Sequence, residues 1–185
     1  MAPSLTPAEL TLLGLIVETP RHGYQLEEVI TARGMRDWTE IGFSSIYYLL
    51  GKLRDRGLIT QAGPSAGGRT TGRRVFAATD EGRRACAEAA ERAIAEPLPL
   101  FPPLLVGLAN QPAIPPGRLH AALERRATAL AGRHREVRAA ADAQPDAPEF
   151  VRAIFDYSLA QLAAERAWLS AYRASLGSTS TPPEG

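Results

Sequence analysis

The change of hydrophobic period at Gly57 constrains the fold of this chain more than any other feature of its 185 residues. The segment before it carries apolar residues at the i, i+3, i+4, i+7 spacing of a helix with one buried face, namely Ile46, Leu49, Leu50 and Leu53. The segments 58–62 and 73–78 have the length and composition of short strands, and the glycine-rich stretch 63–72 joins them. The sequence therefore predicts a helix that leads directly into a two-stranded hairpin.

Two more helices are predicted before this one. Thr6, Pro7 and Glu9 have the order of a capping box with proline at the first helical position, and Pro20 ends the helix that they begin. A second helix is expected from about 24 to 33, because Gly34 follows it and glycine takes a left-handed conformation most easily. The inward-facing residues expected in these two helices are Leu10, Leu13, Val17, Leu26, Val29 and Ile30.

The second half of the chain follows a proline-rich joint. A fourth helix is expected from Asp80 to about Ala95, and four prolines between 97 and 103 then interrupt the chain. A short helix at 104–109 and two long helices, at about 116–141 and 148–176, are predicted after the joint. The expected domains are therefore a unit of helices and a hairpin at 1–96, a helical unit at 97–176 and a disordered tail rich in Ser, Thr, Pro and Gly at 177–185.

Three short helices and a hairpin indicate a winged helix-turn-helix, so the predicted fold class is mainly α with a small two-stranded β-wing. On a helical wheel Tyr48 falls opposite the apolar stripe of the third helix, and Tyr47 lies at the edge of that stripe. The outer side also carries Ser44, Gly51, Lys52 and Asp55. Phenol, hydroxyl and ammonium groups on an outward face suit contacts with phosphates and base edges of DNA. The alternative is a solvated helix face with Tyr47 along the rim of the core.

Charge is distributed unevenly along the chain. The whole chain has a formal net charge of +1, whereas residues 43–79 contain six basic residues and one acidic residue. A local excess of positive charge on a proposed recognition helix and its wing predicts a polyanionic partner, double-stranded operator DNA. A winged-helix module that binds protein without specific DNA binding is the alternative, and the absence of acidic residues from the wing argues against it.

Three segments resemble, in order and spacing, the PadR family of bacterial transcriptional regulators: LLGLIVETPRHGYQLEEVI (12–30), SSIYYLLGKLRDRGLI (44–59) and GRTTGRRVFAATDEGRR (68–84). The resemblance covers about the first half of the chain, and Tyr48 stands where many members have proline. It implies that Tyr24 helps to seat the second helix and reaches the DNA backbone. It also implies that Ser44, Ser45 and Tyr47 face the groove and that three arginines form the wing. The predicted DNA contacts are Tyr24, Ser44, Ser45, Tyr47, Tyr48, Lys52, Arg69, Arg73 and Arg74.

The long helices predict a homodimer. Their apolar stripes exceed what two helices of one chain are expected to cover, and they consist of Leu119, Leu123, Leu130, Val137, Phe155, Leu162, Leu169 and Leu176. The resemblance implies a repressor released by a small aromatic or cationic compound. The predicted effector site consists of aromatic residues near the joint and on the last helix, namely Phe101, Phe150, Tyr157, Trp168 and Tyr172. Trp38 is expected instead to fill the small core of the DNA-binding domain.

No pattern in the chain indicates an enzyme. The three histidines, His22, His120 and His134, have no metal-ligand spacing, and no nucleophile motif is present, so neither a metal nor a cofactor is expected. The single cysteine, Cys86, excludes an intramolecular disulfide. No apolar run approaches about 18 residues, and the first residues lack the pattern of a signal peptide. The chain is therefore expected to be cytoplasmic.

Overall fold

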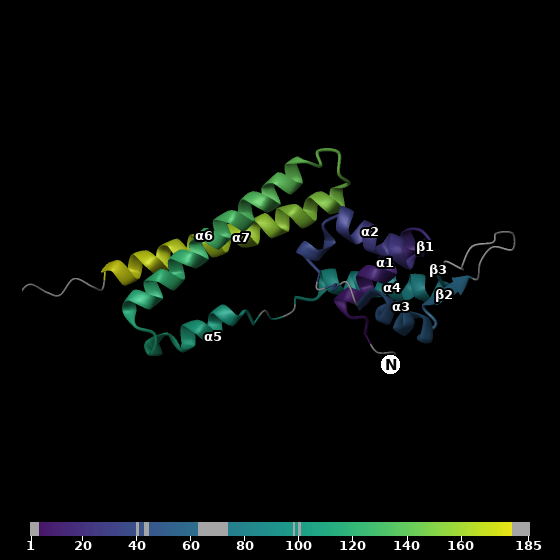
Figure 1. Ribbon diagram of the computed structural model, residues 1–185, viewed down its shortest axis with the longest axis horizontal. Helices are drawn as coiled ribbons and strands as arrows, with labels where there is room; N and C mark the ends of the chain where they lie inside the picture. Colours follow the sequence, from purple (N-terminus) through teal and green to yellow (C-terminus); the bar gives the residue numbers. More distant parts are fainter. Residues whose placement is uncertain are drawn as a thin grey trace, which may run out of the picture. The chain divides into compact units, whose positions relative to one another are not determined.

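The computed structural model describes residues 4–39, 41–42, 45–62, 74–97, 99 and 101–178. Internal contacts divide the chain into two units between Pro99 and Leu100. The first unit consists of α1 (Pro7–Glu18), β1 (Arg21–His22), α2 (Gly23–Ala32), η1 (Met35–Asp37), α3 (Ile46–Asp55), β2 (Ile59–Ala62), β3 (Val75–Ala78) and α4 (Asp80–Ala95). The second consists of α5 (Pro103–Ala109), η3 (Gln111–Ala113), α6 (Pro116–Asp142) and α7 (Glu149–Ser178) (Figure 1).

The helix ends lie where the caps predict them. The Thr6 hydroxyl accepts the Glu9 N–H at 3.2 Å, and the Glu9 carboxylate accepts the Thr6 N–H at 2.8 Å, so the capping box of α1 is confirmed. Gly34 and Gly57, which follow α2 and α3, have φ angles of 60° and 72°. Both glycines therefore occupy the left-handed conformation that L side chains rarely adopt.

The predicted two-stranded wing is present as β2 and β3, and among the described residues the short strand β1 adds a third strand beside β3. The antiparallel order is β1–β3–β2, with Val75 of β3 between His22 on one side and Ala62 on the other. A strand of two residues carries no detectable period. Its pairing with β3 becomes visible only when the chain has folded.

The core of the first unit surrounds α1, which contacts α3, β3 and α4. The predicted inward face of α1 is only partly right, because Leu13 is fully buried but Leu10 and Val17 are half-buried. A helix in contact with three elements is buried around most of its circumference. The core consists of Leu12, Leu13, Leu15, Ile16, Leu26, Ile30, Met35, Ile41, Ile46, Leu49, Leu50, Leu53, Leu58, Ile59 and Phe76.

Trp38 does not fill this core. Its side chain is 47% exposed, and the buried residues near it in the sequence are Met35 and Ile41. The expectation for Trp38 is therefore wrong. Met35 and Ile41 belong to the core instead.

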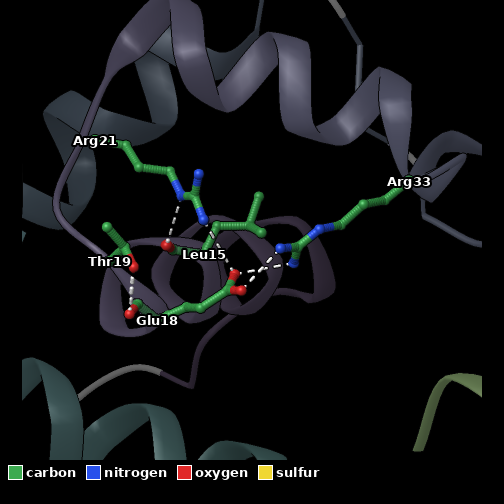
Figure 2. Close-up of polar contacts among 5 residues, drawn as sticks. All are labelled: Leu15, Glu18, Thr19, Arg21 and Arg33. Atoms are coloured by element: carbon green, nitrogen blue, oxygen red, sulfur yellow. Dashed lines mark hydrogen bonds and ion pairs between the residues drawn. The ribbon is translucent and has the colours of Figure 1, made fainter. Parts of the chain in front are cut away.

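An ion-pair cluster joins the end of α1 to the end of α2 (Figure 2). The Glu18 carboxylate accepts two hydrogen bonds from the Arg33 guanidinium, at 2.8 and 2.9 Å, and a third from Arg21 at 3.3 Å. The Arg33 hydrogen bonds hold the pKa of Glu18 below its usual value. Arg21 also donates to the Leu15 carbonyl at 3.3 Å, so the residue that begins β1 is fixed to α1. The cluster thereby helps to set the angle between α1 and α2.

In the second unit α6 and α7 lie side by side as an antiparallel hairpin (Figure 1). Their predicted apolar stripes have a role within the single chain, because Leu123, Val137 and Leu169 are buried. The other five stripe residues, Leu119, Leu130, Phe155, Leu162 and Leu176, are half-buried. The single chain therefore covers these stripes only in part, and their role in pairing with a second copy stays a prediction. Helix α7 extends through Gly177 and Ser178, two residues into the predicted tail, because helical hydrogen bonding continues past Leu176; residues 179–185 lie outside the described ranges.

Candidate nucleic-acid interface

The outer face of α3 carries two exposed phenols. Tyr47 and Tyr48 are 66% and 68% exposed, because the opposite face of the helix buries Ile46, Leu49 and Leu53 in the core. Gly51 lies on the outer side, and a Cβ added there would meet no atom within 4 Å. The sequence predicted Tyr48 outside and Tyr47 at the edge, whereas the structure exposes both to nearly the same extent.

The Tyr47 ring lies over the first residue of α2. Gly23 is buried, and a Cβ at that position would lie 2.7 Å from Cε1 of Tyr47. Glycine at this position therefore allows the close approach of α3 to the start of α2. The same contact limits the positions that the Tyr47 ring can take.

A hollow of about 440 Å³ opens beside Tyr47, between the start of α2, the outer side of α3 and the strands. It is lined by His22, Gly23, Tyr24, Tyr47, Leu50, Gly51, Arg54, Gln61, Arg74 and Phe76. Two arginines and no acidic residue are among its lining residues, so its walls favour an anion. The rings of His22 and Tyr24 stack with centroids 5.5 Å apart.

Arg54 is a residue of this hollow that the sequence reasoning missed. It lies seven positions after Tyr47, and seven residues are about two helical turns, so the spacing alone could have placed both on one face. Its guanidinium also donates to the neighbouring Asp55 carboxylate at 2.9 Å. Arg54 and Asp55 are 47% and 69% exposed, so this ion pair is weak and easily exchanged for another anion.

Lys52 was predicted to share the DNA-facing side, but its ammonium contacts α1. Lys52 Nζ lies 2.8 Å from Oε1 of Glu9, and Arg56 Nη1 lies 3.4 Å from Oε2. Glu9 is 1% exposed. Burial alone would raise its pKa, but Lys52 and the Thr6 N–H outweigh that effect and the pKa of Glu9 is lowered. The Glu9 contact in turn raises the pKa of Lys52.

The structure describes some of the remaining predicted DNA contacts and not others. Tyr24 is 37% exposed and borders the hollow. Ser45 stands directly before α3, and its hydroxyl donates to the Gly42 carbonyl at 2.7 Å. Arg74 is exposed immediately before β3. Ser44, Arg69 and Arg73 lie outside the described residues, so their predicted roles stay predictions.

The five predicted effector residues do not form one cluster in a single chain. Phe150 and Trp168 are 18 positions apart on the continuous helix α7, a separation of about 27 Å. Trp168 stacks on Tyr172 with centroids 5.3 Å apart, and the Tyr172 hydroxyl donates to the Gln111 side chain. Phe101 and Tyr157 are 84% and 65% exposed. A helix cannot bring both of its ends to one small ligand.

Neither a metal-binding group nor a membrane-spanning helix is found in the ranges that the structure describes. No group of three or more His, Cys, Asp or Glu side chains there is placed to hold a metal ion. No helix in the same ranges is long and apolar enough to cross a membrane.

Comparisons with known proteins identify a similar sequence family for part of the chain and a similar fold. Residues 12–88 match the family described as the Transcriptional regulator PadR-like family. The fold is similar to that of Bacillus subtilis PadR in complex with operator DNA, with a TM-score of 0.72 and a sequence identity of 17%. The match covers 90% of this chain and 97% of the other. It also matches Bacillus subtilis PadR in complex with p-coumaric acid, at 17% identity, 91% and 98% coverage and a TM-score of 0.71.

A PadR-like regulator from Bacillus cereus matches at 15% identity, 93% and 99% coverage and a TM-score of 0.66. No curated protein matches the sequence. At these identities the solved structures establish the fold alone, which is mainly helical with a small antiparallel sheet. The match of residues 12–88 confirms the resemblance seen in the sequence, because this part of the chain is similar to the PadR-like family of transcriptional regulators.

Proposed function

We propose that this protein is a sequence-specific DNA-binding regulator, a homodimeric repressor released by a small aromatic effector, and not an enzyme. One observation carries the proposal: the exposed phenol of Tyr47 on α3 lines a hollow whose charged lining residues are Arg54 and Arg74. Phenols beside guanidinium groups suit a nucleic acid, because arginine binds phosphate and tyrosine reaches base edges and sugars. In this proposal α3 enters the major groove and the β2–β3 hairpin contacts the adjacent backbone.

The first prediction follows from the separate roles proposed for the hairpin, which contacts the DNA backbone, and for α3, which contacts the bases. Arg74→Ala should weaken binding to all DNA sequences and reduce the slope of log affinity against log salt by about 0.9, the effect of one lost phosphate contact. Tyr48→Ala should instead cost about 1–3 kcal/mol at particular base pairs. Titrations of the full chain with DNA from upstream of its own gene, at several salt concentrations, measure both effects.

Two controls sharpen this comparison. Arg84→Ala removes an exposed arginine of α4 that pairs with Glu81, and it should leave the salt slope unchanged. Tyr48→Phe keeps the ring and removes only the hydroxyl, so it separates stacking from hydrogen bonding. If Arg74→Ala and Tyr48→Ala have the same sequence-independent effect, the proposed division of work is wrong.

Gly51 gives a second prediction with effects of opposite sign. Gly51→Ala should stabilise the fold by about 0.5–1 kcal/mol, because alanine favours a helix over glycine and the added Cβ meets no atom within 4 Å. The same methyl group lies on the face proposed to approach the groove, so operator binding should weaken by about 1–3 kcal/mol. Denaturant unfolding and operator titration of the same sample check both. An unchanged operator affinity would place the DNA on another face.

Dimeric assembly and release by an effector follow from the proposed regulatory role. A twofold dimer would bind a near-palindromic operator with half-sites one or two DNA turns apart. Bacillus subtilis PadR has been crystallised with operator DNA and with p-coumaric acid, which supports a comparable partner and a planar aromatic effector here. Release would follow if the ligand favoured a dimer in which the two α3 helices no longer match the operator.

The alternative is a winged-helix module that binds a protein partner. Glu9 favours it to some degree, because it neutralises part of the positive charge of α3. The two functions separate in one experiment. Specific retention of the upstream DNA supports the regulator, whereas equal, weak binding of all sequences at low salt supports the protein-binding module.

A further inference from the structure

Gly23, the first residue of α2, is buried although it contributes no side chain to the core. It lies on the buried face of the helix, three and seven positions before Leu26 and Ile30. Among the glycines that the structure describes, only Gly34 and Gly57 have positive φ angles, so the backbone conformation at Gly23 does not require glycine. The space around this position is therefore what requires a residue without a Cβ.

The Tyr47 ring fills that space. A Cβ at Gly23 would lie 2.7 Å from Cε1, 3.1 Å from Cζ and 3.2 Å from the hydroxyl oxygen of Tyr47, whereas ordinary van der Waals contact begins at 3.4 Å. The Tyr47 side chain is nevertheless 66% exposed. The edge of the ring that carries the hydroxyl is thus supported by the backbone of α2, while most of the side chain is open to a partner.

The chain at Gly23 cannot easily retreat from an added methyl group. Arg21 and His22, directly before it, pair with β3 as the strand β1. The His22 N–H also donates to the Gln25 side chain at 2.8 Å, which fixes the first turn of α2. The Tyr47 ring, in contrast, is the far end of an exposed side chain. A Cβ at position 23 would therefore move the ring and leave the backbone in place.

The size of this movement is large enough to matter for recognition. The ring edge would have to withdraw by about 0.7 Å, the difference between 3.4 and 2.7 Å. A side chain that recognises a partner has to be held within about 0.5 Å of its productive position. One methyl group at Gly23 would therefore be enough to take the Tyr47 phenol out of reach of a base edge.

We propose that Gly23 is a positioning residue for DNA recognition, because the start of α2 holds the Tyr47 phenol where it contacts a base pair. Both residues line the hollow beside α3, so their contact lies at the surface proposed to meet DNA. This inference rests on the proposed DNA-binding function. It assigns part of the discrimination between base pairs to a residue outside the helix that enters the groove.

Gly23→Ala tests the assignment through discrimination between sequences. The ratio of operator affinity to affinity for unrelated DNA should fall about tenfold, the effect of one lost base contact. The slope of log affinity against log salt should stay the same, because no phosphate contact is lost. Gly14→Ala in α1 is the matched control, because a Cβ there meets no atom within 4 Å, and it should leave the ratio unchanged.

A second background shows whether the effect passes through the ring. Tyr47→Ala alone should lower the ratio at least as much as Gly23→Ala does. Adding Gly23→Ala to Tyr47→Ala should lower it no further, because the ring that the methyl group displaces is absent. An equal fall in both backgrounds, or no fall in the natural chain, would overturn the proposal.

Two measurements without DNA separate this inference from the proposed function. The midpoint of denaturant unfolding should change little in Gly23→Ala, since an exposed ring gives way, and a large decrease would mean that the backbone of α2 moves instead and would overturn the proposal. In nuclear magnetic resonance spectra of the natural chain, the Cα protons of Gly23 should show a nuclear Overhauser effect to the ring protons of Tyr47. If the chain discriminates its upstream DNA and this effect is absent, only the role of Gly23 is wrong. If the effect is present and the chain does not discriminate, the DNA-binding function is wrong and the role of Gly23 with it.

Discussion

Gly82→Ala is expected to destabilise the first unit by about 3 kcal/mol or more. A Cβ at Gly82 would overlap the Leu58 carbonyl oxygen and lie 2.9 Å from its carbon. That carbonyl cannot move away easily, because it accepts the Thr79 N–H and the Thr79 hydroxyl, each at 3.1 Å. The first turn of α4 is therefore seated against backbone, and an added methyl group must displace the helix or the chain before β2.

Thermal unfolding followed by circular dichroism measures this effect. A loss of 1 kcal/mol lowers the Tm of a domain of this size by roughly 4–8 °C, so a decrease of more than 10 °C is expected. Gly14→Ala in α1 is the matched control, because a Cβ there meets no atom within 4 Å and should stabilise the helix by about 0.5–1 kcal/mol. Equal Tm values for the two variants would contradict the close packing of Gly82 in α4 against the Leu58 carbonyl.

Glu9→Ala is expected to lower the free energy of unfolding by about 2 kcal/mol. The change removes the acceptor of the Thr6 N–H and the buried partner of Lys52 and Arg56. The loss is smaller than for a fully buried pair, because both cations reach solvent when released. Glu9→Gln should cost less, since its amide oxygen still accepts the Thr6 N–H.

The pH dependence of stability identifies the Glu9 charge. Its pKa is lower in the folded chain, so the stabilisation is present above the unfolded value of about 4.3 and is lost as the pH falls through the folded value. Glu9→Gln should therefore remove part of the acid sensitivity below about pH 4.5. Glu18, whose pKa is also lowered, acts in the same window, so Glu18→Gln is the necessary comparison. If Glu9→Gln leaves the free energy of unfolding below about pH 4.5 unchanged in its dependence on pH, the negative charge of Glu9 does not stabilise the fold.

The same variant should alter DNA binding. Removal of the Glu9 charge leaves Lys52 of α3, and Arg56 directly after the helix, without their buried counter-ion. Affinity for non-specific DNA should therefore rise and the salt slope should become steeper. The discrimination between operator and other DNA should fall, because this gain does not depend on sequence. Equal salt slopes for Glu9→Gln and the natural chain would mean that the two cations do not reach the DNA.

Local features of the sequence determined the helices and most of their ends. Thr6 and Glu9 form the capping box, Gly34 and Gly57 have positive φ angles, and the four apolar residues of α3 are all buried. Each depends on residues within one or two turns of the chain, where spacing translates directly into geometry. The match of residues 12–88 to a family of regulators rests on the same local motifs.

Contacts between distant residues were decided only by the tertiary structure. Counting charges over 43–79 could not include Glu9, which comes from α1 and neutralises Lys52 more than 40 positions away. The apolar stripes that the sequence assigned to a second copy are partly covered within one chain, where Leu123, Val137 and Leu169 are buried. Periodicity identifies an apolar face but not the surface that covers it. That surface depends on how segments far apart in the chain come together in space.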